Sequence, residues 1–254
     1  MLVGVGESLK NGNRAVGTML RMVRNPAIAS VAAQAGVDFI MLDMEHGGYS
    51  MESVGDVAIL ARASGISCFI RVPELAKSYV SRALDSGCDG IMVPMIAGVN
   101  DAKALGSWAK YPPVGNRGFG SAGGHTAYGA VKKPVDFFEK ANKANVAIAQ
   151  IEMVSAIEEI DGIAELAGID ALLIGPNDLA ISYGIPGQLE SPVIEKAIGT
   201  VAAAAKKHGK IFGMHGPDSL IERWVPEGLR LIMSSLDIAM LTAGLRGVVE
   251  KYGS

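Results

Sequence analysis

Two carboxylates stand where consecutive apolar runs end, and their spacing favours metal chemistry. Glu152 closes the run 147–152, and Asp178 follows the next run, 171–175. If these runs are neighbouring parallel strands, about 4.8 Å apart, the two side chains converge. Two unpaired carboxylates that close repel each other, and a divalent cation such as Mg²⁺ or Mn²⁺ relieves the repulsion. The alternative is that Asp178 caps a helix while Glu152 lies near a helix N-terminus.

Arg71 follows an apolar run, 68–70, and arginine is seldom buried without a partner. If the apolar runs are the strands of a barrel, we expect Arg71 to clamp an anion or oxyanion inside the mouth of that barrel. The alternative is a structural salt bridge to Glu45 or Glu74.

His46 follows the next apolar run toward the N-terminus, in the segment Asp-Met-Glu-His-Gly-Gly. A neutral imidazole there could move protons near pH 7. It could equally be a hydrogen-bonded loop histidine. Asp85 either orients His46 or lies at a solvated helix end.

The elements that must position these residues are short apolar runs with polar or Gly/Pro ends. Nearly continuous apolar runs are typical of strands buried on both faces of a parallel sheet. The predicted strands cover residues 15–20, 37–43, 67–72, 90–95, 147–152, 171–175, 211–215 and 230–234. The helix-like segments between and after them cover residues 26–34, 51–64, 78–86, 102–110, 155–167, 192–208, 219–224 and 237–250.

Strand and helix alternate eight times, which predicts an α/β fold: one (β/α)8 TIM barrel over residues 1–254, ending in the helix 237–250. The alternative, a doubly wound open sheet, would usually carry a glycine-rich first turn, and residues 22–25 contain no glycine. Glycines 36, 65, 87, 168 and 209 are predicted to end five helices in the left-handed conformation.

One connection, residues 112–145, is unusually long, and such connections are usually active-site or binding loops. It carries Arg117, which we interpret mainly as a loop anchor, and His125, which could contact the distal part of a substrate. His215, at the end of a predicted strand, is interpreted as a core histidine.

Composition excludes several classes of protein. The chain is 49 % hydrophobic with a net charge of −3, which excludes intrinsic disorder. It contains no apolar stretch long enough for a membrane span, no signal-like N-terminus and no basic patch suited to nucleic acid. Cys68 and Cys88 lie in apolar stretches and indicate a cytoplasmic protein in a reducing environment. No lysine lies at the carboxyl end of a predicted strand, which argues against Schiff-base catalysis.

Several motifs in the same order resemble the HpcH/HpaI aldolase family, the metal-dependent class II pyruvate aldolases. The resemblance spans roughly residues 15 to 245. It rests on segments 36–38 with 43–46, 70–72, 83–87, 90–94, 111–118, 150–152 and 175–179.

The resemblance implies a TIM barrel, usually a homohexamer with C-terminal helices exchanged between subunits. It implies a divalent metal (Mg²⁺, Mn²⁺ or Co²⁺) held by Glu152 and Asp178. The reaction implied is the reversible cleavage of a 4-hydroxy-2-oxo acid to pyruvate and an aldehyde, through a metal-stabilised pyruvate enolate.

By the same resemblance, Arg71 stabilises the enolate oxygen, and His46 paired with Asp85 handles protons. Gln150 would lie beside the metal. Backbone amides of the turn from Gly175 through Pro176 and Asn177 to Asp178 would hold the substrate carboxylate.

One departure bears on the substrate. Many relatives place an arginine after the segment 117–121, suited to a distal carboxylate, but here residues 122–126 read Ala-Gly-Gly-His-Thr. This favours a smaller, neutral or sugar-derived aldehyde partner. Two alternatives stay open: a citrate-lyase-like enzyme acting on a CoA thioester, and a non-catalytic barrel that binds a small acid.

Overall fold

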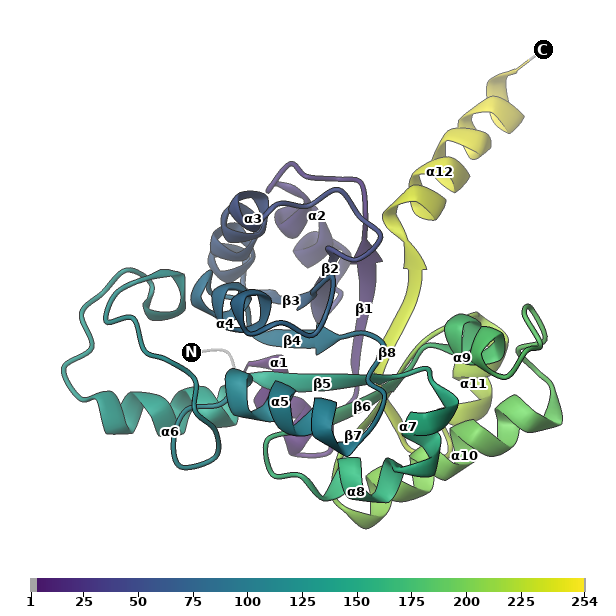
Figure 1. Cartoon of the computed structure of the whole chain (residues 1–254). Coiled ribbons are helices and arrows are strands. Elements are labelled where there is room, and N and C mark those ends of the chain that lie inside the picture. Colours follow the sequence, from purple (N-terminus) through teal and green to yellow (C-terminus); the bar gives the residue numbers. More distant parts are fainter. Residues whose placement is uncertain (1–3, 254) are drawn as a thin grey trace.

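Eight parallel strands close into a barrel in the order of the chain, with β8 paired to β1 (Figure 1). The structure, a computed structural model, describes residues 4–253. The predicted (β/α)8 fold is confirmed, and the ends of β1 and β7 are those predicted. The strands are β1 (Ala15–Leu20), β2 (Phe39–Asp43), β3 (Ser67–Arg71), β4 (Gly90–Val93), β5 (Val146–Ile151), β6 (Ala171–Ile174), β7 (Ile211–His215) and β8 (Leu229–Leu236).

Helices surround the barrel, and most lie where the sequence predicts them. The predicted segments correspond to α2 (Ile28–Ala35), α3 (Met51–Ser64), α4 (Lys77–Asp85), α5 (Val99–Ala109), α7 (Val154–Glu158) with α8 (Ile160–Glu165), α10 (Pro192–Lys207), α11 (Asp218–Trp224) and α12 (Asp237–Tyr252). The segment 155–167 is therefore two short helices, and the C-terminal helix runs two residues past its predicted end. The sequence reading missed α1 (Val5–Lys10), the single turn η1 (Gly124–Thr126), α6 (Pro134–Ala144) and α9 (Pro176–Ser182).

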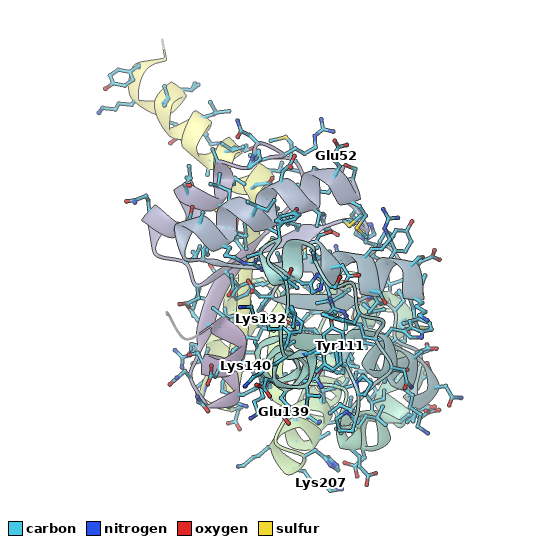
Figure 2. All side chains as sticks on the ribbon, turned by 90° about the vertical axis from the view of Figure 1, so that its left-hand side faces the viewer. Glu52, Tyr111, Lys132, Glu139, Lys140 and Lys207 are labelled. Carbon is cyan, nitrogen blue, oxygen red and sulfur yellow. The ribbon has the colours of Figure 1, made fainter. Side chains whose placement is uncertain are left out.

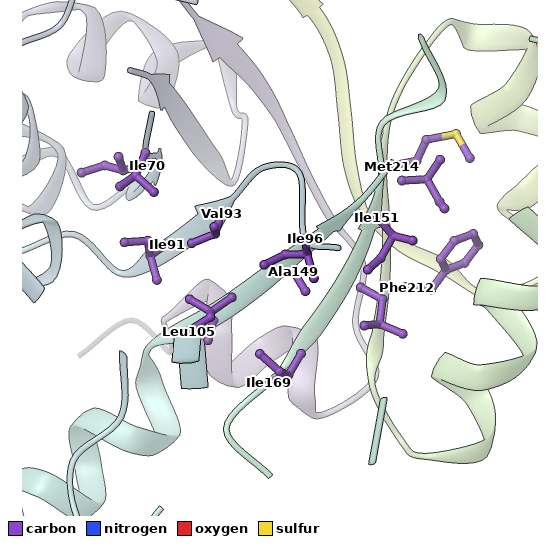
Figure 3. Packing of buried hydrophobic residues seen from close by; sticks show 14 of the residues in the cluster. Ile70, Ile91, Val93, Ile96, Leu105, Ala149, Ile151, Ile169, Phe212 and Met214 are labelled. Carbon is purple, nitrogen blue, oxygen red and sulfur yellow. The ribbon is translucent and has the colours of Figure 1, made fainter. Parts of the chain in front are cut away.

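Alternating strand positions build two separate apolar layers, because successive side chains point to opposite faces of the sheet. The outer layer packs between strands and helices; Figure 3 shows part of it, including Ile91, Ile151 and Phe212. The inner layer fills the lumen of the barrel. Its buried members are Leu9, Ala15, Met19, Phe39, Met41, Phe69, Met92, Val146, Ile148, Ala171, Leu173, Ile211, Leu231 and Met233.

Four of the five predicted helix-ending glycines, at positions 36, 65, 87 and 209, have the expected positive φ. Gly168 does not. It is required for another reason: a Cβ added there would lie 2.7 Å from the Cα of Gly106, so the backbones before β6 and within α5 pack directly together.

The long connection 112–145 lies at the amino end of the strands, away from the mouth. Arg62 at the end of α3 donates a hydrogen bond to the Gly124 carbonyl (2.7 Å), and the Gly124 backbone lies against Ser86 after α4. Figure 2 looks onto the face that carries Tyr111, Lys132 and Glu139. Within one chain the segment does not line the barrel mouth, contrary to our expectation. The reason is topological: it leads from a helix into a strand, and strands begin at the amino end.

The C-terminal helix α12 projects from the barrel instead of packing on its outside (Figure 1). Apart from Asp237, none of its residues is buried. Its large apolar side chains are between 44 % and 74 % exposed: Ile238, Met240, Leu241, Leu245, Val248, Val249 and Tyr252. Within residues 4–253, no helix combines the length and apolarity needed to cross a bilayer.

Candidate active site

The inward-facing positions change from apolar to polar at the carboxyl ends of the strands, which we call the mouth. Continuing the alternation past the apolar lumen layer gives a polar layer. Two residues beyond a lumen residue lie Arg21 beyond β1, Asp43 on β2, Arg71 on β3 and Gln150 on β5, and His215 on β7 lies four residues beyond Ile211. The polar groups of several strands therefore face one another above an apolar floor.

Arg71 and Asp43 form a buried, two-pronged ion pair. Arg71 Nε donates to Asp43 Oδ1 (2.8 Å) and Nη2 donates to Oδ2 (2.6 Å), while Nη1 lies 2.9 Å from Glu45 Oε2. Burial alone would raise the pKa of Asp43, but the hydrogen bonds and charge of Arg71 outweigh it and hold that pKa below its ordinary value. Conversely, Asp43 keeps Arg71 charged in spite of burial. Arg71 is thus both structurally paired and rigidly presented at the mouth.

Asp43 was missed as a site residue, although the sequence held a signal for it. It occupies the last inward position of β2, opposite Arg71 in the strand register. It is fully buried, accepts a further bond from Arg21 Nε (2.7 Å), and receives the backbone N–H groups of Glu45 and His46. It therefore organises both Arg71 and the turn that carries His46.

Glu152 follows β5 and is almost completely buried. The backbone N–H of Met95 donates to its Oε1 (2.8 Å), and the Gln150 amide contacts its Oε2. Burial, together with the negative charges of Asp178 and Glu45, raises the pKa of Glu152 to about 7, in spite of the Met95 bond and the charge of Arg71. A carboxylate held this way is stabilised by a nearby cation.

The surroundings of Glu152 fit a hard divalent ion. Asp178 lies in the first turn of α9, and its charge acts on Glu152. Gly175 leaves the space open, since a Cβ there would come within 2.4 Å of Glu152 Oε2 and 2.9 Å of Gln150 Nε2. The buried Oε1 of Gln150 has no hydrogen-bond partner. The atoms available to bind a metal, the carboxylate oxygens of Glu152 and Asp178 and the Oε1 of Gln150, are all oxygens, which suit Mg²⁺ or Mn²⁺.

The protein does not enclose such an ion completely. Among residues 4–253, no three His, Cys, Asp or Glu side chains converge as a ligand set. The turn 175–178 offers few backbone donors, because Pro176 has no N–H and the Gly175 N–H is directed to the Ile151 carbonyl (3.5 Å). The amides of Asn177 and Asp178 are the ones left to meet a substrate carboxylate.

His46 lies at the mouth, but the structure does not bring it to Asp85. Its side chain is 51 % exposed, and its Nε2 lies 3.9 Å from Glu45 Oε2. Asp85 ends α4 near the opposite end of the barrel, where it accepts a hydrogen bond from Arg117 Nη2 (2.6 Å). Within one chain the implied His46–Asp85 pair is therefore not formed.

Arg117 and His125 also lie far from the mouth, packed into the connection 112–145. The Arg117 side chain is 1 % exposed and its guanidinium lies over the Tyr111 ring, 4.7 Å from the centroid. His125 Nε2 lies 2.9 Å from the Gly120 carbonyl oxygen. These contacts support the interpretation of Arg117 as a loop anchor, and His125 anchors the same segment.

Residues 19–223 match the family HpcH/HpaI aldolase/citrate lyase. The chain is 32 % identical to a 4-hydroxy-4-methyl-2-oxoglutarate aldolase from Hapsidospora irregularis, over 89 % of this chain and 85 % of that protein. It is also 32 % identical to a 4-hydroxy-2-oxovalerate aldolase from Novosphingobium aromaticivorans, over 91 % of this chain and 87 % of that protein.

A solved structure supports the same relationship. The crystal structure of an HpcH/HpaI aldolase from Desulfitobacterium hafniense superposes with a TM-score of 0.91 at 32 % identity, covering 99 % of this chain and 98 % of that one. The match therefore includes α12 as well as the barrel.

Proposed function

Because the chain belongs to the HpcH/HpaI aldolase/citrate lyase family and is a carbon–carbon lyase of the aldolase type, we propose that it reversibly cleaves a 4-hydroxy-2-oxo acid to pyruvate and an aldehyde. Substrates that carry both a 2-oxo and a 4-hydroxyl group are shared by the names of the two 32 %-identical relatives. The observation that carries the proposal is the polar layer at the mouth. There Asp43 holds the guanidinium of Arg71 in place, and the charge of Arg71 acts on the buried carboxylate of Glu152. The aldolase relatives argue against the non-catalytic alternative.

Arg71 would stabilise the charge that develops during cleavage. Loss of the C4 hydroxyl proton lets the C3–C4 bond break, the aldehyde leaves, and the bonding electrons move to the C2 oxygen as an enolate. Of the five N–H donors of Arg71, Asp43 takes two and the Met19 sulfur one, which leaves the Nη1 group, 2.9 Å from Glu45 Oε2, to donate to that oxygen. Because Asp43 holds the guanidinium in place beforehand, little reorganisation is needed as the charge forms.

We assign the cation site to Glu152 and Asp178, with Gln150 beside it, and we favour Mg²⁺, Mn²⁺ or Co²⁺. When bound, such an ion supplies a Lewis acid that polarises the keto group. His46, exposed at the mouth and next to Glu45, is our candidate for taking the C4 hydroxyl proton and returning it in the synthetic direction. Transfer of a proton from protonated His46, directly or through water, to C3 of the enolate then gives pyruvate and returns His46 to its neutral form.

We also propose that the protein is a homo-oligomer, a hexamer by family resemblance, in which α12 packs on another copy. A TIM barrel normally covers each strand with the helix that follows it. Here α12 points away, so Val16 on the outer face of β1 is 42 % exposed while the apolar side chains of α12 are exposed as well. Exchange of α12 between copies would cover both surfaces. We further propose a single domain over residues 1–254, in a reducing cytoplasm that suits the buried free thiols of Cys68 and Cys88.

The decisive test measures pyruvate release from a panel of 4-hydroxy-2-oxo acids that differ in the aldehyde half. The assay is run on protein treated with a chelator and then on the same protein with Mg²⁺, Mn²⁺ or Co²⁺ restored. We expect activity to disappear with the chelator and to return with at least one ion. Activity that ignores the chelator would refute the metal assignment, and no release from any substrate with any ion would refute the aldolase proposal.

A further inference from the structure

His215 is a member of the polar layer that the reaction described above does not use. Along β7, Ile211 belongs to the lumen layer while Phe212 and Met214 belong to the outer layer, so His215 points inward. The next residue, Gly216, packs close to Pro176, since an added Cβ would lie 3.3 Å from its Cγ. Pro176 begins α9, the helix that carries Asp178. The backbone that follows His215 therefore lies beside the turn of the proposed cation site.

A local irregularity of β8 fixes the orientation of this ring. Between Gly17 and Met19 of β1, the partner strand advances three residues, from Met233 to Leu236, which marks a β-bulge. Within it Ser235 has a φ of +64°, a conformation that non-glycine residues rarely adopt. Its carbonyl oxygen accepts from Thr18 Oγ1 (3.3 Å) and lies 3.4 Å from His215 Nε2. Strained residues of this kind are concentrated at functional sites.

The contact with Ser235 also sets which ring nitrogen carries the proton. A carbonyl oxygen can only accept, so Nε2 must be the N–H and Nδ1 of the neutral ring keeps its lone pair. Burial lowers the pKa of His215, and the positive charges of Arg71 and Arg21 lower it further, against the opposing effects of the Ser235 bond and Asp43. The ring is thus a neutral hydrogen-bond acceptor at neutral pH.

The charged side chains near the ends of β7, β8 and β1 each have at least one hydrogen-bond partner. Asp237 accepts backbone N–H groups from residues 21, 22, 23 and 238. Asp218 accepts from Ser234 Oγ (2.9 Å), and Arg21 donates to Asp43 through its Nε. In this part of the mouth, His215 offers a side chain that could form a hydrogen bond with a substrate group.

We propose that His215 determines specificity for the aldehyde half of the substrate, by accepting a hydrogen bond through Nδ1 from a hydroxyl group carried by that half. This inference rests on the proposed aldolase function and narrows it to hydroxylated aldehydes. A neutral acceptor favours a hydroxyl donor over a carboxylate, which has no proton to give. His215 would leave the pyruvate half untouched, because Arg71 and the turn of Asp178 serve that half.

The experiment separates the two halves of the reaction in wild-type protein, His215→Leu and His215→Gln. The first measurement is the metal-supported exchange of pyruvate methyl protons for deuterium in heavy water, without an aldehyde. The second is the ratio of kcat/KM for glycolaldehyde to that for acetaldehyde in condensation with pyruvate, since these differ by one hydroxyl. His208→Leu is the matched control, because His208 pairs with Asp161 at the end of α10, remote from the mouth.

We expect His215→Leu to lower the glycolaldehyde preference by about three- to tenfold, as loss of one neutral hydrogen bond should. Proton exchange should stay within about twofold of wild type, and His208→Leu should leave both measurements unchanged. An unchanged preference in His215→Leu, or a parallel loss of proton exchange, would overturn the assignment. If the leucine variant does not fold, His215→Gln decides. It should keep proton exchange and lower the preference for glycolaldehyde over acetaldehyde. Wild-type protein that shows neither exchange nor condensation with any ion would instead refute the aldolase proposal.

Discussion

Replacing Arg71 tests the centre of the proposed chemistry, because this side chain links the fold of the mouth to the stabilisation of the enolate. Arg71→Ala removes two hydrogen bonds to Asp43 and the contact to Glu45. It also removes the Nη1 group that we expect to donate to the C2 oxygen of the substrate. Loss of a single preorganised donor at a developing oxyanion typically costs about 2.7–4 kcal/mol, or roughly 10²–10³ in turnover. We expect kcat to fall by at least about 100-fold.

The same substitution destabilises the fold, so the two effects must be separated. Breaking a buried ion pair by removing one partner costs about 3–5 kcal/mol. Asp43 keeps one cationic partner, Arg21, and two backbone N–H donors, which should place the loss toward the lower end. For a domain of this size, a loss of 3–5 kcal/mol lowers Tm by roughly 6–20 °C. Total stabilities of about 5–15 kcal/mol leave the variant folded at 25 °C in most of that range.

Arg71→Lys provides the matched comparison. A lysine keeps the charge but cannot bond Asp43 through two parallel prongs, so it should present its ammonium less rigidly. We expect an activity between those of wild type and Arg71→Ala. The assay couples pyruvate release to a dehydrogenase at saturating substrate and metal, with folded fractions measured by circular dichroism. Turnover of folded Arg71→Ala within about tenfold of wild type would show that Arg71 does not stabilise the transition state.

Three further predictions follow from the geometry. Gly175→Ala should weaken Mn²⁺ binding by at least about tenfold, since its Cβ would lie 2.4 Å from Glu152 Oε2. Gly55→Ala on α3, with open space around the added Cβ, should leave Mn²⁺ binding unchanged, and equal Mn²⁺ dissociation constants for the two variants in a titration would contradict the prediction. Burial would raise the pKa of Asp237, but its backbone hydrogen bonds outweigh burial and lower it. The carboxylate therefore stabilises the fold fully above the unfolded pKa near 4, and this stabilisation is lost as the pH falls through the native pKa. In urea unfolding from pH 6 to 2.5, the free energy of unfolding should decline less steeply for Asp237→Asn than for wild type. Leu245→Asp, on the exposed apolar side of α12, should shift the mass measured by light scattering toward the monomer, and an unchanged mass would argue against exchange of α12.

The strand pattern was readable from the sequence because it records a local physical fact. Strands buried on both faces must be apolar at nearly every position, and each must end where polar side chains can reach water. For this reason the ends of β1 and β7 were predicted correctly, and Glu152 was predicted as a site residue. Short or highly exposed helices left no comparable signal: α6 has no buried residue, and α9 is brief.

Other features were present in the sequence but were misread or overlooked. The position of residues 112–145 follows from connectivity alone, since a segment that leads from a helix to a strand must reach the amino end of the barrel. The inward alternation of β2 and β7 likewise marked Asp43 and His215. Counting positions from the apolar lumen residues would have included both in the polar layer.

The sequence by itself determined the barrel, the order of its strands and which side chains face the lumen, because these depend on alternation and burial along each short segment. Only the tertiary structure decided which charges meet: Arg71 with Asp43 and Glu45, and Asp85 with Arg117 instead of His46. It also shows α12 leaving the barrel, which the strand and helix pattern did not record. Pairings and directions of this kind depend on distances between segments far apart in the chain, and no local pattern of residues records them.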